Sequence, residues 1–255
     1  MLIKSYVNII IVFFAILLSQ FISPKSISFE GNKKIETFFE SKIILRDIFQ
    51  NNQYTFYCSC SYEHKKPIFK TCGYKPYKNF KRANRIEWEH IVPASRFGKK
   101  FESWKNGNLK CIKNGKKFKG RKCARKISKK FRLMEADLYN LQPTVGEINQ
   151  RRQNFKMSII PGEKRNYGKC DFEVQNRFIE PSPNIRGDIA RTYFYMATNY
   201  SNYIKLDKSE LSLFSEWNNV DPVDEWECKK SKLIQKSQKN LNKFVAQSCK
   251  ELDKK

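Results

Sequence analysis

The chain has 255 residues, of which 40% are apolar and 14% aromatic, and a formal net charge of +25. The apolar content can bury a core and fits one elaborated domain, which excludes a wholly disordered chain. Lys and Arg number 50 against 25 Asp and Glu, and such a surplus attracts nucleic acid or, as alternatives, anionic membranes and acidic polysaccharides. A genomic bias that inflates lysine is the non-functional explanation, so charge alone identifies no enzyme.

The first residues are typical of a secretory signal. Lys4 lies in a short basic start, and an apolar run from about Val7 to Leu18 precedes a polar region. This run is shorter than the roughly 20 residues that a membrane-spanning helix needs. We therefore predict a signal peptide over residues 1–23 and one folded domain over residues 24–255, in the periplasm or outside the cell. An uncleaved anchor is the alternative, because no clear cleavage motif follows the run.

A helix is expected over Gly31–Gln50, where apolar residues recur near helical spacing and would face the core. These residues are Ile35, Phe38, Phe39, Ile43, Leu45 and Phe49. The strand formers of Tyr54–Cys58 predict an extended segment, and Cys72–Tyr74 predicts another. The Lys- and Gly-rich stretch Asn106–Lys130 predicts a long basic loop held by a disulfide.

The cysteines follow the predicted signal peptide and number eight: Cys58, Cys60, Cys72, Cys111, Cys123, Cys170, Cys228 and Cys249. An even number in an oxidising compartment predicts four disulfides. Zinc binding is disfavoured, because it needs closely paired ligands, and the chain offers only one C-x-C pair, at Cys58 and Cys60, with no histidine close to a second cysteine pair. The pairing stays open, although proximity favours Cys111 with Cys123 and Cys228 with Cys249.

The segment around His90 suggests catalysis. Ile86 and Trp88 alternate with Glu87 and Glu89 as in a strand that ends near Pro93. Adjacent strand residues point to opposite faces, so Glu89 and His90 can share a site only where the strand ends. A carboxylate beside an imidazole on a very basic chain favours metal-assisted attack on a phosphodiester. A structural histidine beside a surface glutamate is the alternative, and that interpretation is the one we give to His64.

A second polar cluster lies between Met134 and Arg152. Pro143 and Thr144 predict the start of a helix that carries Asn149 and Arg152 on one face, with Ile148 turned away. An asparagine amide oxygen suits Mg²⁺, and an arginine one turn later can hold a phosphate or a carboxylate. A solvated helix face explains the same residues without a function.

The C-terminal third is predicted to be helical. Ile189–Met196 has apolar residues on most sides, as in a buried helix. Asp207 and Glu210 are spaced as a capping box, and Asp221 followed by Pro222 predicts another helix start. The aromatic residues of this region are interpreted as core.

Several ordered blocks together resemble the bacterial endonuclease I family of periplasmic or secreted non-specific nucleases. The blocks are Glu87–Ala94, Met134–Asp137, Asn140–Pro143, Val145–Asn149 and Ala190–Met196. The likeness extends from about Tyr54 to Cys249. It implies an α+β fold, a mixed α/β single domain stabilised by disulfides, with a ββα-metal (His-Me finger) active site.

The resemblance also implies roles for individual residues. His90 matches the general base that activates water, and Glu89 and Asn149 match the ligands of one Mg²⁺ ion, which Ca²⁺ or Mn²⁺ can replace. Glu135 matches an additional active-site acid that acts through a water ligand of the metal. Arg121 matches the arginine that steadies the scissile phosphate, with Arg125 as the alternative. The remaining residues expected to contact nucleic acid are Lys122, Arg125, Asn140 and Arg152.

The implied activity is non-specific hydrolysis of DNA, and of RNA, by a monomer without an obligatory protein partner. Backbone contacts by Lys and Arg explain sequence-indifferent cutting. One alternative is an exported nucleic-acid-binding or uptake protein without cleavage activity. A basic adhesion or toxin-like protein is the other alternative, and it explains none of the ordered motifs.

Overall fold

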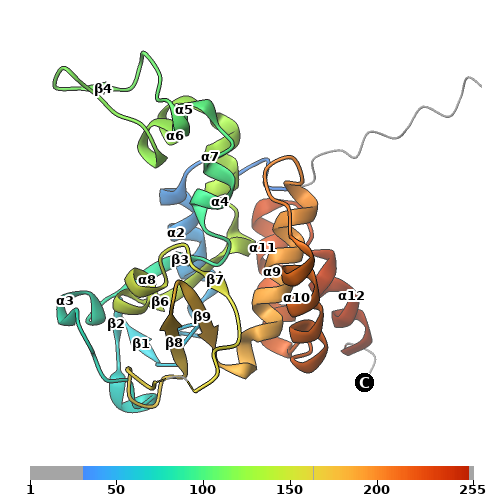
Figure 1. Ribbon diagram of the computed structural model, residues 1–255. Helices are drawn as coiled ribbons and strands as arrows, with labels where there is room; N and C mark the ends of the chain where they lie inside the picture. The colour runs from blue at the N-terminus through green and yellow to red at the C-terminus, as the bar shows by residue number, and fades with distance from the viewer. Residues whose placement is uncertain (1–30, 163, 253–255) are drawn as a thin grey trace, which may run out of the picture.

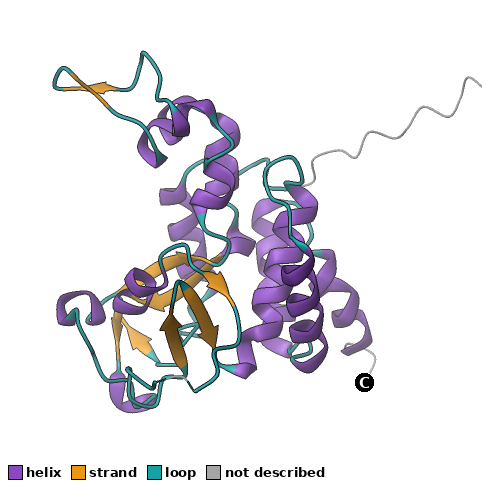
Figure 2. Cartoon of the chain, viewed as in Figure 1, coloured by secondary structure: helices purple, strands orange, loops and turns teal. Residues whose placement is uncertain are grey.

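Helices and short strands alternate along the chain in the computed structural model, which describes residues 31–162 and 164–252. The predicted signal peptide over residues 1–23 lies outside the described residues. Figures 1 and 2 show most of the strands gathered at one end, with a column of C-terminal helices beside them and a group of short helices above. One hairpin, over residues 112–117, lies apart from the other strands and extends from the short helices. No helix among the described residues is long and apolar enough to span a membrane.

The helices of the described residues are, in chain order, α2 (Phe38–Ile48), α3 (Phe80–Ala83), α4 (Ala94–Gly98), α5 (Glu102–Lys105), α6 (Arg121–Ile127), α7 (Lys129–Glu135), α8 (Gly146–Arg152), α9 (Arg186–Asn199), α10 (Lys208–Val220), α11 (Glu225–Gln238) and α12 (Lys243–Leu252). Short 3₁₀ turns cover η1 (Phe69–Thr71), η2 (Leu138–Asn140) and η3 (Pro183–Ile185). The strands are β1 (Tyr62–Glu63), β2 (Lys66–Pro67), β3 (Ile86–His90), β4 (Ile112–Lys113), β5 (Lys116–Lys117), β6 (Leu141–Val145), β7 (Lys156–Met157), β8 (Phe172–Gln175) and β9 (Phe178–Pro181). They form four small sheets, β1-β2, β3-β6, β4-β5 and β7-β9-β8.

The N-terminal helix α2 is shorter than the predicted one, and the expected core residues Ile35, Leu45 and Phe49 are buried. The Thr37 hydroxyl caps it by accepting a hydrogen bond from the Glu40 amide. The buried helical residues are Ser41, Leu45 and Ile48. The prediction that Phe39 and Ile43 face the core is wrong, because they lie on the other side of the helix and are 67% and 40% exposed.

The central unit of the fold is the antiparallel pair β3-β6, which places Ile86 opposite Val145 and His90 opposite Leu141. The predicted strand at β3 is confirmed. The predicted helix start at Pro143 is wrong, because Pro143 lies inside β6 and pairs with Trp88. The Pro143 carbonyl accepts a hydrogen bond from the Phe56 amide at 2.8 Å, so the backbone groups of Pro143 face away from β3 and its missing N–H leaves no gap in the ladder. The helix α8 follows directly at Gly146.

The predicted extended segments at Tyr54–Cys58 and Cys72–Tyr74 are wrong. Tyr54 and Tyr74 each make only an isolated bridge, and turns surround them. Two disulfides, Cys58–Cys170 and Cys60–Cys72, hold this region instead of a sheet. Cross-links and local hydrogen bonds therefore replace the ladder that strand propensity predicted.

The basic stretch Asn106–Lys130 is only partly a loop. It forms the hairpin β4-β5 and then the helix α6, with Cys111 joined to Cys123. Figure 1 shows the hairpin projecting away from the rest of the molecule. The predicted pairings Cys111–Cys123 and Cys228–Cys249 are both confirmed.

The C-terminal helices pack against each other and against the central unit. The buried helix predicted around Ile189–Met196 is confirmed as part of α9, and Asp207 and Glu210 form the predicted capping box of α10. The predicted helix start at Asp221 is wrong, because this residue ends α10. Asp224 starts α11 instead, and its side chain accepts a hydrogen bond from the Glu227 amide at 2.7 Å.

Candidate active site

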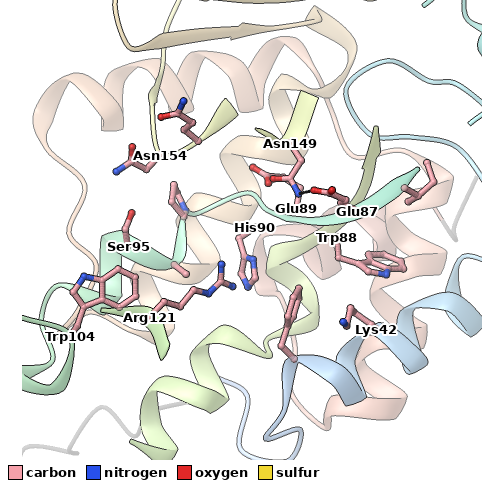
Figure 3. A pocket seen from close by; sticks show the side chains of 15 residues that line it. Lys42, Glu87, Trp88, Glu89, His90, Ser95, Trp104, Arg121, Asn149 and Asn154 are labelled. Carbon is pink, nitrogen blue, oxygen red and sulfur yellow. Dashed lines mark hydrogen bonds between the residues drawn. The ribbon is translucent and has the colours of Figure 1, made fainter. Parts of the chain in front are cut away.

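The end of β3 opens into a cavity of about 530 Å³ that both Glu89 and His90 line. Asn149 from α8 and Arg121 from the start of α6 line the same cavity. Figure 3 shows Glu89 and Asn149 together on one side of His90, while Arg121 approaches His90 from another side. The structure therefore brings together four of the residues that the sequence singled out, from three separate segments of the chain.

The His90 ring is held in a defined orientation. Its Nε2 lies 2.9 Å from the backbone carbonyl oxygen of Glu135. A carbonyl can only accept a hydrogen bond, so Nε2 carries the proton and Nδ1 keeps a free lone pair. Burial, together with the positive charge of Arg121, lowers the pKa of His90 to about 3. The imidazole is therefore neutral at physiological pH and can accept a proton at Nδ1.

Glu89 is a buried carboxylate with an incomplete set of partners. It is 5% exposed, and its Oε1 lies 3.0 Å from Nε of the fully buried Arg152. This oxygen accepts no hydrogen bond from the described residues. Burial raises the pKa of Glu89 to about 7, although the charges of Arg152 and Arg121 oppose this rise. A cation in the cavity would favour the ionised carboxylate.

The side-chain amide of Asn149 is oriented by Glu87, a residue that sequence reasoning missed. Nδ2 of Asn149 donates to Glu87 Oε2 at 3.0 Å, which leaves Oδ1 of Asn149 as an acceptor. Glu87 is itself held by Arg82 and Arg85, whose Nε atoms lie 3.0 Å and 2.7 Å from Oε1. Glu87 lies two residues before Glu89 on β3, so the period of a strand could have identified it.

A glycine allows α8 to begin beside Glu87. A Cβ atom on Gly146 would lie 2.6 Å from the backbone oxygen of Arg82 and 3.0 Å from the carboxyl group of Glu87. A larger residue would therefore move α8 away from β3, and Asn149 with it. The close approach of the two elements sets the position of the Asn149 amide.

Two arginines of α6 bind the carboxylate of Glu135. Arg121 Nε lies 2.5 Å from Oε1, and Arg125 Nε lies 2.6 Å from Oε2. Burial raises the pKa of Glu135, but the two guanidinium groups outweigh burial and lower it overall. Glu135 therefore holds the side chains of both arginines.

Arg121 and not Arg125 lines the cavity. The Nη2 atom of Arg121 is buried and makes no hydrogen bond to the described residues. This nitrogen is a donor available for an anion. The geometry therefore favours Arg121 over Arg125 as the group that contacts a phosphate, although Arg125 remains on the exposed side of the same helix.

The prediction that Asn140 and Arg152 contact nucleic acid is wrong, because both side chains are fully buried. Asn140 clamps the turn after His90: its Oδ1 accepts from the Val92 amide at 2.7 Å and its Nδ2 donates to the Val92 carbonyl at 3.0 Å. Arg152 donates to the carbonyl of Ile91 and pairs with Glu89. Both residues hold the end of β3 in position. Lys122 is exposed on α6 and stays a predicted contact.

The fold and the site together define a class of protein. A neutral base, a buried carboxylate and an arginine with a free donor meet in one cavity of a strongly basic, disulfide-bonded α+β domain, and this combination is typical of a hydrolase for anionic esters. Comparison with known proteins specifies the class further. The family model described as Endonuclease I matches residues 19–249. The chain belongs to the endonuclease I family, and it is a nuclease whose substrate is a nucleic acid.

Individual relatives agree with this assignment. The chain is 40% identical to Endonuclease-1 of Buchnera aphidicola subsp. Acyrthosiphon pisum, over 90% of this chain and 88% of the relative. It is 38% identical to an extracellular deoxyribonuclease of Aeromonas hydrophila, over 84% of this chain and 90% of the relative. It is also 38% identical to a periplasmic deoxyribonuclease of Aeromonas hydrophila, over 85% of this chain and 88% of the relative. The chain is accordingly an exported protein, of the periplasm or the extracellular space.

Proposed function

We propose that the chain is a Mg²⁺-dependent endonuclease that hydrolyses DNA without sequence specificity and uses His90 as its general base. The observation that carries this proposal is the orientation of His90, whose Nε2 is bound to the Glu135 carbonyl at 2.9 Å while Nδ1 is free. The antiparallel strands β3 and β6, followed by α8, support a ββα-metal motif with His90 at the end of its first strand. A neutral imidazole with a free nitrogen can take a proton from the attacking water.

Glu89 and Asn149 would hold the metal ion. Their oxygens are the hard ligands that Mg²⁺ prefers, and two protein ligands with several waters are typical of its sites. When bound, Mg²⁺ supplies charge stabilisation for the phosphate and the leaving 3′ oxygen. Ca²⁺ or Mn²⁺ would occupy the same ligands.

Arg121 would contact the scissile phosphate from the other side of the cavity. Its Nε is bound to Glu135, so the side chain is positioned while Nη2 is free to donate. An arginine held in this way offers a directed, charge-assisted hydrogen bond to a phosphate oxygen. The mechanism thus divides between His90, which accepts the proton, and Arg121, which binds the charge that develops on phosphate.

A plasmid-nicking assay on the oxidised protein tests this function. With Mg²⁺ we expect nicked and linear products from supercoiled plasmid, and with EDTA we expect none. Binding of DNA without any Mg²⁺-dependent cleavage would refute the enzyme and favour the uptake protein.

A parallel assay with single-stranded RNA tests whether the site also accepts ribonucleotides, as we propose. Sedimentation of the same sample tests the proposed monomer, and its N-terminal sequence tests cleavage after residue 23.

The hairpin β4-β5 and α6 would supply many of the electrostatic contacts with the DNA backbone. The stretch Ser103–Met134 contains 13 Lys and Arg and no Asp or Glu. Lys113, Lys116 and Lys117 are exposed in the hairpin, and Arg121 begins the following helix. A substrate bound along this surface would reach the cavity directly.

We expect DNA affinity to fall steeply with salt, and the hairpin lysines to account for part of the slope. In the triple variant K113Q/K116Q/K117Q, the slope of log Kd against log salt concentration should decrease by about 0.9 for each duplex phosphate that the variant no longer neutralises. The matched control is K229Q/K236Q/K250Q, which removes the same charge from exposed positions on α11 and α12. Equal slopes in the two variants would mean that the hairpin makes no specific contribution.

Activity should depend on the Cys111–Cys123 disulfide more than on the Cys228–Cys249 disulfide. Cys123 lies two residues after Arg121 in α6, so loss of the first bridge frees the segment that carries the phosphate contact. Each native disulfide contributes on the order of 2 to 5 kcal/mol of stability. We expect C111S/C123S to lose more activity than C228S/C249S at comparable melting temperature, as measured by plasmid nicking. Full activity of the dithiothreitol-treated wild-type protein, with eight titratable thiols, would contradict this expectation.

A further inference from the structure

A second cavity, of about 410 Å³, adjoins the active-site cavity. Both cavities are lined by Lys42 from α2 and by Ile86 and Trp88 from β3. Figure 3 shows Trp88 and Lys42 on the side of His90 that faces away from Arg121 and Trp104. Trp88 precedes His90 by two residues of a strand, which is a separation of about 7 Å along β3. A polynucleotide that crosses the first cavity therefore passes beside the second.

The lining of the second cavity combines positive charge with flat rings. The cations are Lys42, Arg46 and Lys65, and the rings are those of Tyr62, His64 and Trp88. None of the described residues that line the cavity is acidic. Cations attract phosphate, and ring faces stack on bases, so this combination is typical of a site for single-stranded nucleic acid.

The wall formed by Trp88 is rigid. Its indole ring packs edge-on against Phe49, with the ring centroids 5.6 Å apart. The hairpin loop between β1 and β2 is tied to the same strand, because the Ile86 amide donates to the Lys65 carbonyl at 2.8 Å. His64 and Lys65 are thereby held at a fixed place relative to Trp88.

The hairpin loop contains backbone strain at the two residues that face the cavity. His64 and Lys65 have φ angles of 47° and 72° in a two-residue turn between paired strands. Such turns favour Asn and Gly, because most other residues rarely adopt positive φ. Strained residues of this kind cluster at sites that bind ligands. The sequence had suggested only a structural role for His64, and its place at the cavity changes that interpretation.

We propose that the second cavity binds an unstacked base of the nucleotide next to the scissile phosphate, with its phosphate held by Lys42, Arg46 and Lys65. This inference rests on the proposed nuclease function. A base can enter the cavity only after it leaves its neighbours in the stack. The enzyme should therefore bind single-stranded or locally opened DNA in preference to a closed duplex.

The test compares two ligands that carry the same phosphates: an oligothymidylate, and an abasic chain of equal length. Binding is measured by fluorescence competition in EDTA, with the oxidised His90→Ala protein, so that the oligothymidylate stays intact. We expect this protein to bind the oligothymidylate more tightly by roughly 5- to 150-fold for each stacked base. Because both ligands are uniform, the position at which the chain binds does not affect the comparison.

Two substitutions at the cavity should reduce this preference. His64→Asn keeps a residue that tolerates positive φ, and Tyr62→Leu keeps an apolar side chain. Each should lower the preference for the oligothymidylate by at least about fivefold and leave the affinity for the abasic chain unchanged. The melting temperature of His64→Asn should not decrease, because asparagine suits this turn.

The controls separate a base contact from a charge contact. Arg46→Gln should weaken binding of both ligands by the same factor. Tyr77→Leu changes an exposed tyrosine that lines neither cavity, and it should leave the preference unchanged. An equal loss for both ligands in His64→Asn and Tyr62→Leu would overturn the base site, as would an unaltered preference in both variants or the absence of any preference in the His90→Ala protein.

Failure of this inference is distinguishable from failure of the proposed function. Plasmid nicking with Mg²⁺ by the wild-type protein tests the nuclease, whereas the base preference is measured without metal or cleavage. If the preference is observed but plasmid is not nicked, the base site is supported and the proposed catalysis is refuted. If plasmid is nicked but the preference is absent, the catalysis is supported and the base site is refuted.

Discussion

His90→Ala is expected to cut DNA about 10²- to 10⁴-fold more slowly than the wild-type protein, while DNA affinity in EDTA stays nearly unchanged. The substitution removes the free Nδ1 lone pair that would accept the proton of the attacking water. Arg121 and the exposed lysines remain in place to bind phosphate. Rates are measured by single-turnover cleavage of a labelled duplex with Mg²⁺, and affinity by fluorescence anisotropy without metal.

Chemical rescue distinguishes the loss of a base from a structural defect. The His90 ring fills part of a cavity and packs against Phe38, with the ring centroids 5.0 Å apart. Removing it leaves a space of the same shape, so added imidazole should restore part of the cleavage rate of His90→Ala. A solute of similar size without a basic nitrogen should not restore the cleavage rate. Turnover close to that of the wild-type protein without imidazole would refute the assignment of His90 as the base.

Asn149→Ala is expected to weaken metal activation by at least about tenfold, because loss of a ligand should cost no less than loss of an outer hydrogen-bond partner. Its stability should change little. Asn149 is only half-buried, and its side-chain amide is held by a hydrogen bond from Nδ2 to Glu87. The measurements are Mn²⁺ affinity by electron paramagnetic resonance, the Mg²⁺ concentration that gives half-maximal cleavage, and the melting temperature.

Glu89→Ala should lose both metal affinity and stability. Glu89 pairs with Arg152, which is fully buried, so the substitution leaves an uncompensated charge inside the protein. Breaking a buried pair in this way typically costs about 3 to 5 kcal/mol. A large loss of stability is therefore expected for Glu89→Ala and not for Asn149→Ala. Urea unfolding of the two variants tests the difference.

The control for both ligand variants is Glu63→Gln, an exposed carboxylate that lines neither cavity. It should keep the metal affinity, the stability and the cleavage rate of the wild-type protein. If Asn149→Ala binds Mn²⁺ as well as this control, then Asn149 is not a metal ligand. In that case the proposed metal site is wrong even if cleavage requires Mg²⁺.

Local patterns were sufficient for some of the fold. The alternation of residues in Ile86–His90 predicted β3, and the apolar residues of Ile189–Met196 predicted part of α9. Asp207 and Glu210 predicted a capping box because the two side chains act on backbone groups within one turn. Proximity along the chain predicted two of the disulfides. Each of these features depends on residues a few positions apart or on a short closed loop.

Other features depended on contacts between distant segments. Asn140 and Arg152 were expected to contact nucleic acid, which requires an exposed position. Packing of η2 and α8 behind β3 buries both side chains and gives their polar atoms partners there. The strand propensity of Tyr54–Cys58 likewise gave way to turns fixed by disulfides to Cys170 and Cys72.

The sequence by itself determined the exported, disulfide-bonded and basic character of this protein and its family, because charge, cysteine number and short motifs are properties of the chain. It also singled out His90, Glu89 and Asn149 as residues of the proposed site. Only the tertiary structure decided that Glu87 orients Asn149, that Glu135 holds Arg121, and that Arg152 lies beneath Glu89. It alone assembled the second cavity from α2, the β1-β2 hairpin and β3. The reason is that burial and side-chain orientation follow from packing between segments far apart in sequence, which no local pattern encodes.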